Sequence, residues 1–561
     1  MISKFYKIIF ICLIFFVHNI SYSKNSKILS FNENNVSNYF SALVSFDNNK
    51  ESLKFFHGSR DLKETHKTYI KNYIFSLISD GKINKAIYEI QTIKNKNFLN
   101  FFESHLLLLL NQLKKKNYKE SLIHLNDLKK YREEGTFELI ISSVLEDYIL
   151  LFDDKKINYN KKNSFGQFSQ INLALQSCYL DKPATAALFQ NVINYENDGS
   201  SRYLFFYINY LLSQKNFTKV TEISRTIDYL DTTLLVSQTK MWIEEKNYIN
   251  IEKIFSCKNP NDIISELFFV ISNLYSSENQ INKSNFYFNL SNYFNPKFKY
   301  NLTLLSNNYL QSKNFFKSKK ILNNFNKKDK IYHWYKIKKN TEIIETQSDD
   351  DKSFTYLNIE FKKIKKPYIK IIYDMANIAK KYGLYDLSIE YYSTLLLKLD
   401  SNSLMYAKVL YRRGGSYERI GNEKKSDKDL IQSLNINPNQ PDVLNYLAYD
   451  WLERGYKIND AIEMLEKAYE KKKNDPYIID SIGWAYYLIG NYVKAEKLLK
   501  KALQLMPRDP VVNDHYGDVL WKLDRKLQAN YYWKSALTFD ETESAMKDKI
   551  YYKILKGPNK I

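Results

Sequence analysis

Seven histidines and an absence of catalytic motifs define the chemistry that this sequence offers. The chain has no phosphate-binding glycine loop, no G-x-S-x-G elbow, no H-E-x-x-H and no pair of C-x-x-C motifs. The histidines are too dispersed to suggest a metal site. They are His18, His57, His66, His105, His124, His333 and His515. We therefore predict that the protein is not an enzyme and uses no metal or other cofactor.

One histidine lies next to carboxylates, in the segment N-D-H-Y-G-D-V-L-W. Asp514, His515 and Asp518 could form a polar cluster on one helical turn, as in an enzyme subunit with a dispersed site. We favour a structural interpretation, in which Asn513 or Asp514 caps the helix and His515 packs beside Tyr516. The enzyme remains the first rival hypothesis.

Helical hairpins are the elements that must position these residues. On both sides of Gly490, apolar residues recur three and four positions apart, which predicts two amphipathic helices joined by a tight turn. Gly483, Ala495 and Ala502 lack bulky side chains, so we expect the helices to approach closely there. The same small residues recur 34 positions later, at Gly517, Ala529 and Ala536.

Five consecutive units keep this register over residues 369–543. A 34-residue period with small residues at three fixed places and a closing proline, such as Pro507, resembles the tetratricopeptide family. The resemblance implies an all-α fold, a tetratricopeptide-type α-solenoid of stacked helical hairpins. Residues 24–345 show a weaker form of the rhythm and are predicted to be degenerate repeats, and residues 544–561 a terminal helix or tail. The weaker turns include Asn117-Tyr118, Asn216-Phe217, Asn247-Tyr248 and Asn314-Phe315.

Residues 1–23 have the layout of a secretory signal peptide. Two lysines precede an apolar run from Ile8 to Val17, and serines surround the expected cut after Ser23. We predict cleavage there and localisation in the periplasm, with an uncleaved anchor as the alternative. No later stretch is long and apolar enough to span a bilayer, so we expect no transmembrane segment in the mature chain.

The cysteines and the net charge leave further alternatives open. Cys178 and Cys257 could pair in an oxidising compartment, but 79 residues separate them. We therefore expect them in different repeats, as two buried free thiols. The formal charge of +21 raises a second rival, a nucleic-acid or anionic-surface binder. Because the lysines are scattered and no binding module accompanies them, we predict no nucleic-acid partner.

The tetratricopeptide resemblance also implies a binding face, because the first helices of successive hairpins line a concave surface in that family. Large aromatics beside carboxylates suit capture of a protein or peptide. Transferred unit by unit, the lining positions are Tyr411, Arg419, Asn445, Tyr449, Tyr477, Asp480, Trp484, Tyr487, Asp514, Asp518, Trp521 and Lys522. For Trp484 and Tyr487, simple packing against the next repeat is the alternative.

One family function is excluded by the residue types. Members that clamp a carboxyl-terminal aspartate use lysine at the fifth place of a unit and asparagine at the ninth. The fifth places here hold Tyr411, Asn445, Asp480 and Asp514, and the ninth hold Gly415, Tyr449, Trp484 and Asp518. The clamp is therefore absent.

A narrower resemblance is carried by LYRRGGSYERIG (410–421) and DSIGWAYYLIG (480–490). These segments look like exported bacterial tetratricopeptide proteins, some of which are outer-membrane lipoproteins that act as adaptors for carboxyl-terminal processing proteases. The resemblance implies a non-catalytic scaffold in the cell envelope whose partner is an envelope protease or assembly factor. Cys12 lies inside the apolar run and lacks the small residues of a lipid site, so outer-membrane association stays open.

Overall fold

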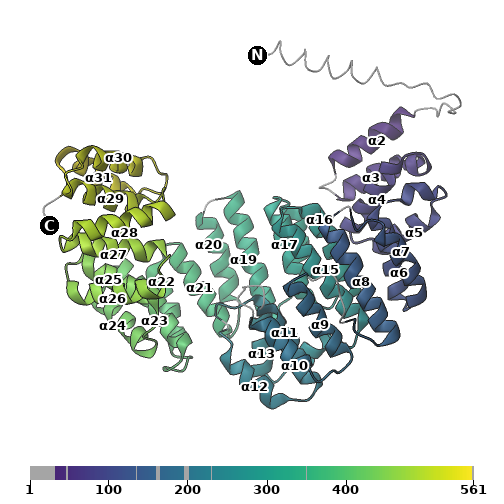
Figure 1. The fold of residues 1–561 in the computed structure, drawn as a ribbon, viewed down its shortest axis with the longest axis horizontal. Helices are drawn as coiled ribbons and strands as arrows, with labels where there is room; N and C mark the ends of the chain where they lie inside the picture. The colour runs from purple at the N-terminus through teal and green to yellow at the C-terminus, as the bar shows by residue number, and fades with distance from the viewer. Residues whose placement is uncertain are drawn as a thin grey trace, which may run out of the picture. The chain divides into compact units, whose positions relative to one another are not determined.

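The computed structural model describes residues 32–45, 49–133, 135–158, 165–194, 201–228, 230–348 and 350–558. Within these ranges the chain forms helices and no strands, so the predicted all-α hairpin fold is confirmed (Figure 1). None of the described helices has the length and apolar character needed to cross a bilayer. The predicted signal peptide lies outside the described residues.

The chain divides into two compact units, each built from two segments. Unit 1 comprises Met1–Glu196 and Glu252–Ile321, and unit 2 comprises Asn197–Ile251 and Leu322–Ile561. The helices of unit 1 are α2 (Glu33–Val44), α3 (Asn49–Gly58), α4 (Lys67–Ser79), α5 (Ile83–Thr92), α6 (Phe102–Lys114), α7 (Tyr118–Lys129), α8 (Thr136–Asp154), α9 (Gln167–Tyr179), α10 (Thr185–Ile193), α15 (Pro260–Ser277), α16 (Ile281–Phe294), α17 (Leu302–Gln311) and α18 (Phe315–Leu322), with short 3₁₀ turns at Arg60–Glu64, Lys96–Leu99 and Lys299–Asn301.

Unit 2 contains the regular repeats. Its helices are α11 (Ser201–Ser213), α12 (Phe217–Thr226), α13 (Leu234–Glu244), α14 (Tyr248–Ile254), α19 (Lys330–Gln347), α20 (Asp350–Lys362), α21 (Ile369–Lys381), α22 (Tyr385–Leu396), α23 (Leu404–Arg419), α24 (Glu423–Ile436), α25 (Pro441–Glu453), α26 (Ile458–Lys471), α27 (Pro476–Leu488), α28 (Tyr492–Leu505), α29 (Pro510–Lys522), α30 (Lys526–Leu537) and α31 (Ser544–Lys556). Figure 1 shows α21 to α30 as successive antiparallel pairs.

The predicted small-residue contacts are confirmed in the hairpin of α27 and α28. Ala495 and Ala502 are fully buried, and a Cβ placed on Gly483 would lie 2.8 Å from Leu499 Cγ. The turn between the helices needs a left-handed backbone at Gly490, with φ of +80°. Asn491 then caps α28, because its side chain accepts a hydrogen bond from the Lys494 N–H.

Helices of unit 1 pack across long sequence distances as well as with their neighbours. The Phe75 ring on α4 lies 4.7 Å from the Phe286 ring on α16, and the Phe137 ring on α8 lies 4.3 Å from that of Tyr275 on α15. A repeat array with strictly neighbouring contacts would not make these pairs. The second segment of unit 1 therefore folds back against the first.

The expectation of two free thiols is wrong, because Cys178 and Cys257 form a disulfide with Cα atoms 5.9 Å apart. Cys178 lies near the end of α9, and Cys257 precedes α15. Lys258 flanks the bridge and pairs with Asp181. Sequence separation misled the expectation, because the residues between the two segments of unit 1 belong to unit 2 and the chain returns beside α9.

Candidate functional site

An open cavity of about 530 Å³ lies on the face formed by the first helices α25, α27 and α29, at the end of α23. Prolines open all three helices, and Asp509 caps α29 by accepting hydrogen bonds from the Val511 and Val512 N–H groups. This cap also brings the Asp509 carboxylate to the cavity. The lining consists of Glu418, Arg419, Asn445, Tyr446, Tyr449, Asp450, Glu453, Tyr477, Asp480, Ser481, Asp509, Val511 and Val512. We call it the acidic cavity.

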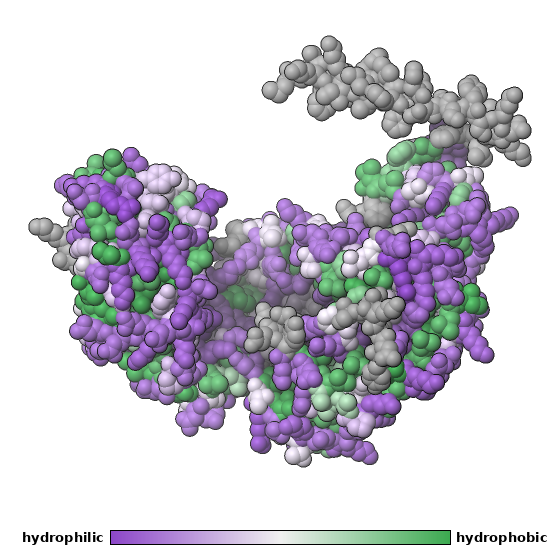
Figure 2. All heavy atoms as spheres, viewed as in Figure 1, coloured by the Kyte–Doolittle hydropathy of each residue, from purple (hydrophilic) through white to green (hydrophobic). Residues whose placement is uncertain are grey.

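Negative charge and phenol rings dominate the acidic cavity. Its lining holds five carboxylates and one basic side chain, Arg419. Burial raises the pKa of Tyr449 far above its usual range, and the charges of Glu453 and Asp480 raise it further. Figure 2 shows that hydrophilic side chains cover much of the visible face of α21 to α31, with smaller hydrophobic areas between them. Because carboxylates outnumber basic side chains in its lining, the cavity favours a positively charged group.

Three rings stack behind the cavity. Trp484 lies between Tyr487 and His515, with ring centroids 4.7 Å and 4.1 Å apart and nearly parallel planes. The Trp484 indole N–H donates to Glu453 Oε1 over 2.8 Å. Tyr487 is only 1% exposed. Tyr487 therefore packs between repeats, which is the alternative that the sequence left open. Most of Trp484 does the same.

The histidine interpretation needs correction. Asp509, not Asn513 or Asp514, caps α29, and His515 stacks on Trp484 rather than packing beside Tyr516. The His515 ring nitrogen Nδ1 lies 3.0 Å from Asp480 Oδ2. Burial lowers the pKa of His515, but the Asp480 carboxylate more than offsets this, so the pKa is raised. The pair joins α27 to α29 in the core.

The last predicted binding positions are covered by the chain itself. Lys553 on α31 donates to Asp514 Oδ2 over 2.7 Å and to Asp518 Oδ2 over 2.8 Å. A Cβ on Gly557 would lie 2.5 Å from the Trp521 indole. Burial raises the pKa of Asp518 to about 6 even though the Lys553 ammonium opposes the shift. The terminal helix thus occupies the face of α29.

The twelve predicted site residues fall into four groups in the structure. Arg419, Asn445, Tyr449, Tyr477 and Asp480 line the acidic cavity. Trp484 and Tyr487 form the stack, while Asp514, Asp518 and Trp521 lie against α31. Tyr411 and Lys522 are half-buried and outside the lining, and the Tyr411 ring contacts Tyr446.

Four carboxylates of the lining, Glu418, Asp450, Glu453 and Asp509, were not among the predicted site residues. A usable signal existed for Glu453, which follows Tyr449 by one helical turn and so shares its face. Asp450 forms an ion pair of 2.5 Å with Arg454, and burial raises the pKa of Asp450.

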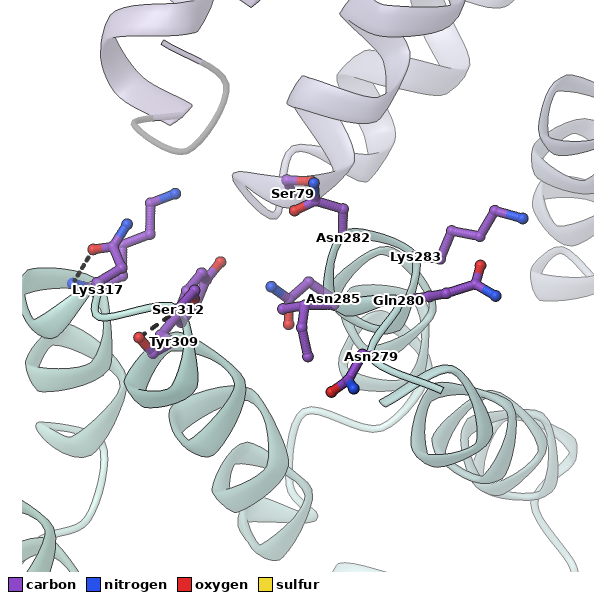
Figure 3. Close-up of a pocket in the computed structure, with 11 residues that line it drawn as sticks. Ser79, Asn279, Gln280, Asn282, Lys283, Asn285, Tyr309, Ser312 and Lys317 are labelled. Atoms are coloured by element: carbon purple, nitrogen blue, oxygen red, sulfur yellow. Dashed lines mark hydrogen bonds between the residues drawn. The ribbon is translucent and has the colours of Figure 1, made fainter. Parts of the chain in front are cut away.

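Unit 1 has a pocket of opposite character, about 430 Å³ in volume. Figure 3 shows Ser79 at the end of α4 near Asn282 and Asn285 of α16, with Tyr309 and Ser312 across the opening. Side-chain amides and two lysines line it, and its described lining contains no carboxylate. The two pockets therefore differ in charge, and only the acidic cavity contains predicted site residues.

Comparison with known proteins agrees with the repeat assignment. Residues 476–509, which form α27 and α28, match the family model described as "Tetratricopeptide repeat". The TPR repeat-containing protein PA4667 of Pseudomonas aeruginosa is 34% identical over 110 residues, which are 20% of this chain and 18% of that protein. The chain carries tetratricopeptide repeats, and proteins of this type generally mediate protein–protein interactions.

Solved structures show only partial similarity. PilW, a type IV pilus biogenesis factor, is 19% identical with a TM-score of 0.30, covering 34% of this chain and 85% of that one. The thermophilic TPR protein TTC0263 of Thermus thermophilus is 17% identical with a TM-score of 0.29, covering 34% and 100%. TM-scores this low carry no functional argument.

Proposed function

We propose that this protein is a non-catalytic scaffold or adaptor that binds a partner protein along the face of α25, α27 and α29. The observation that carries the proposal is the acidic cavity, where polar and aromatic side chains remain accessible. Tyr477 is 64% exposed although it lies on a first helix of the array. Accessible aromatic side chains beside charges supply binding energy at low entropy cost.

The proposed place of action is the bacterial periplasm. A disulfide within unit 1 is expected in an oxidising compartment, and the N-terminal sequence has the layout of an export signal. The partial similarity to PA4667 supports a bacterial repeat protein. A carboxyl-terminal processing protease or an assembly factor is the proposed partner, and peripheral contact with the outer membrane is compatible with it. Holding the partner near an effector would raise its local concentration.

Affinity purification of the mature chain from envelope extract tests the proposal. Replacing Asn445 and Tyr477 together by alanine should remove the captured partner, because both side chains line the cavity and neither fills the core. Asn530 and Tyr531 on α30 provide a matched control pair. Tyr531 is 66% exposed, and neither residue lines the cavity.

The control variant should capture the same partner as wild type, with equal helicity in all three proteins by circular dichroism. Mass spectrometry that finds the same proteins with the Asn445→Ala/Tyr477→Ala variant as with wild type would refute the proposed binding face.

A further inference from the structure

The chain itself shows how a lysine binds on this helix array. The Lys553 ammonium lies between Asp514 and Asp518, which occupy the fifth and ninth places of their unit, and the Trp521 ring lies nearby under Gly557. The side chain of Lys553 is 16% exposed, so its charge is largely withdrawn from water. One cationic side chain thus pairs with two carboxylates on α29, which is the first helix of its hairpin.

The acidic cavity repeats this chemistry one unit earlier. Asp480 holds the fifth place that Asp514 holds in the next unit, and Glu453 brings a second, exposed carboxylate from α25. The whole chain carries a net charge of +21, so a cavity with five carboxylates runs against its average. The one basic side chain of the lining, Arg419, is 57% exposed and lies 3.5 Å from Glu418. Asp450 and Asp480 are already paired with Arg454 and His515, so Glu418, Glu453 and Asp509 are the carboxylates whose charge favours a cation.

Besides charged groups, the cavity contains an unused hydrogen-bond acceptor and aromatic rings. Asn445 Oδ1 is buried, yet accepts no hydrogen bond from the described residues. Tyr446, Tyr449 and Tyr477 add ring faces and edges, against which the methylene stem of a long basic side chain can pack. A volume of about 530 Å³ leaves room for the backbone on either side of that side chain.

We propose that the acidic cavity binds a lysine or arginine side chain within an extended segment of the partner protein. This inference rests on the proposed function and names the chemistry of its partner. The partner's ammonium or guanidinium group would donate to Glu418, Glu453 and Asn445, while Asp480 remains paired with His515.

A positional library of short synthetic peptides is the direct probe, with one position fixed as lysine, arginine, citrulline, norleucine or glutamate. The immobilised mature chain should retain the lysine and arginine pools roughly tenfold better than the citrulline and norleucine pools, the size expected for hydrogen bonds to charged groups. The Glu418→Gln/Glu453→Gln variant should lose this preference. Its amide oxygens can still accept from the Tyr446 hydroxyl and the Trp484 indole, so the fold is preserved.

A control with the same charge change is Glu463→Gln/Glu470→Gln, which alters two exposed carboxylates of α26 outside the lining. It should keep the preference for basic pools. Equal retention of all pools by wild type, or a preference that survives Glu418→Gln/Glu453→Gln, would overturn the inference. So would self-association in sedimentation that the same variant abolishes, because the occupant would then be a second copy.

The two proposals fail separately. If envelope capture depends on Asn445 and Tyr477 but the peptides show no basic preference, the proposed function stands and the cationic occupant is wrong. If basic pools bind through Glu418 and Glu453 but no envelope protein depends on Asn445 and Tyr477, the adaptor function is wrong.

Discussion

The regular array of residues 369–543 and the repeats that precede it use the same turn with different residues. In the array, Gly421 and Gly490 take the left-handed backbone, and Asn422 and Asn491 cap the next helix. In several earlier repeats a lysine takes that backbone, as at Lys215, whose φ is +58°, and in the last hairpin of the array Asp524 takes it. Asn216 still caps the helix that follows Lys215, and Phe217 comes after it as Tyr492 comes after Asn491.

Their packing differs as well. In the array, glycine and alanine allow neighbouring helices to approach, as Gly483 does against Leu499. Unit 1 adds long-range ring contacts and a disulfide between Cys178 and Cys257. The hairpin therefore survives when another residue replaces glycine in the turn, as Lys215 and Asp524 show.

The largest expected effect comes from removing the disulfide, which should weaken unit 1 and leave the array unchanged. Replacing Cys178 and Cys257 by serine should destabilise unit 1 by about 2–4 kcal/mol, because the unfolded chain regains the entropy that the cross-link removes. Amide hydrogen exchange should accelerate in α9 and α15 and stay unchanged in α27 and α28. Equal acceleration in both regions would show that the array depends on the disulfide too.

Gly483→Leu should destabilise the array by roughly 1–3 kcal/mol, because even a Cβ would lie 2.8 Å from Leu499 Cγ. Thermal unfolding followed by circular dichroism measures the loss. Gly490→Ala is the contrasting variant: nothing lies within 4 Å of its Cβ position, so its cost of about 1 kcal/mol comes from the left-handed backbone and not from overpacking. An unchanged melting curve for Gly483→Leu would contradict close helix approach.

A reciprocal pair of substitutions tests whether the array and the earlier repeats share one turn. Gly490→Lys should cost roughly 1 kcal/mol, and Lys215→Gly should gain a similar amount, since lysine is strained in the left-handed region and glycine is not. Both positions are exposed, so lost packing does not confuse the result. Urea unfolding of the two variants gives the free energies. Changes of the same sign would refute a shared turn.

The smallest expected effect is a pH dependence. The pKa of His515 is raised in the folded chain, so its pairing with Asp480 stabilises fully below pH 6.5 and is lost as pH rises through the folded pKa. Asp514 and Lys553 also face this histidine. The unfolding midpoint of wild type should fall above pH 6.5, and His515→Gln should flatten that slope. An identical slope in the variant would exclude His515 as the cause.

Sequence predicted the fold where small residues recur at a fixed spacing. The apolar periodicity around Gly490 placed the hairpin, and Gly483, Ala495 and Ala502 marked where its helices approach closely. The family model matches residues 476–509 inside the array, and lysine turns such as that at Lys215 weaken the pattern in the earlier repeats.

The site was predictable only in part. Tyr449, Tyr477 and Asp480 were predicted from their positions within the repeat, and all three line the cavity. The cover of α31 over α29 was not predictable, because Lys553 lies outside the repeating register. The disulfide was missed for a related reason, since chain re-entry into unit 1 leaves no periodic trace.

Site-specific photo-crosslinking tests the central claim most directly, namely that the face of α25, α27 and α29 binds a partner. Benzoylphenylalanine would replace Tyr477 in the cavity or Tyr531 on α30, which are 64% and 66% exposed. Irradiation in envelope extract should yield a discrete crosslinked protein from position 477 and none from position 531. Crosslinks of equal yield at both positions, or at position 531 alone, would contradict the account.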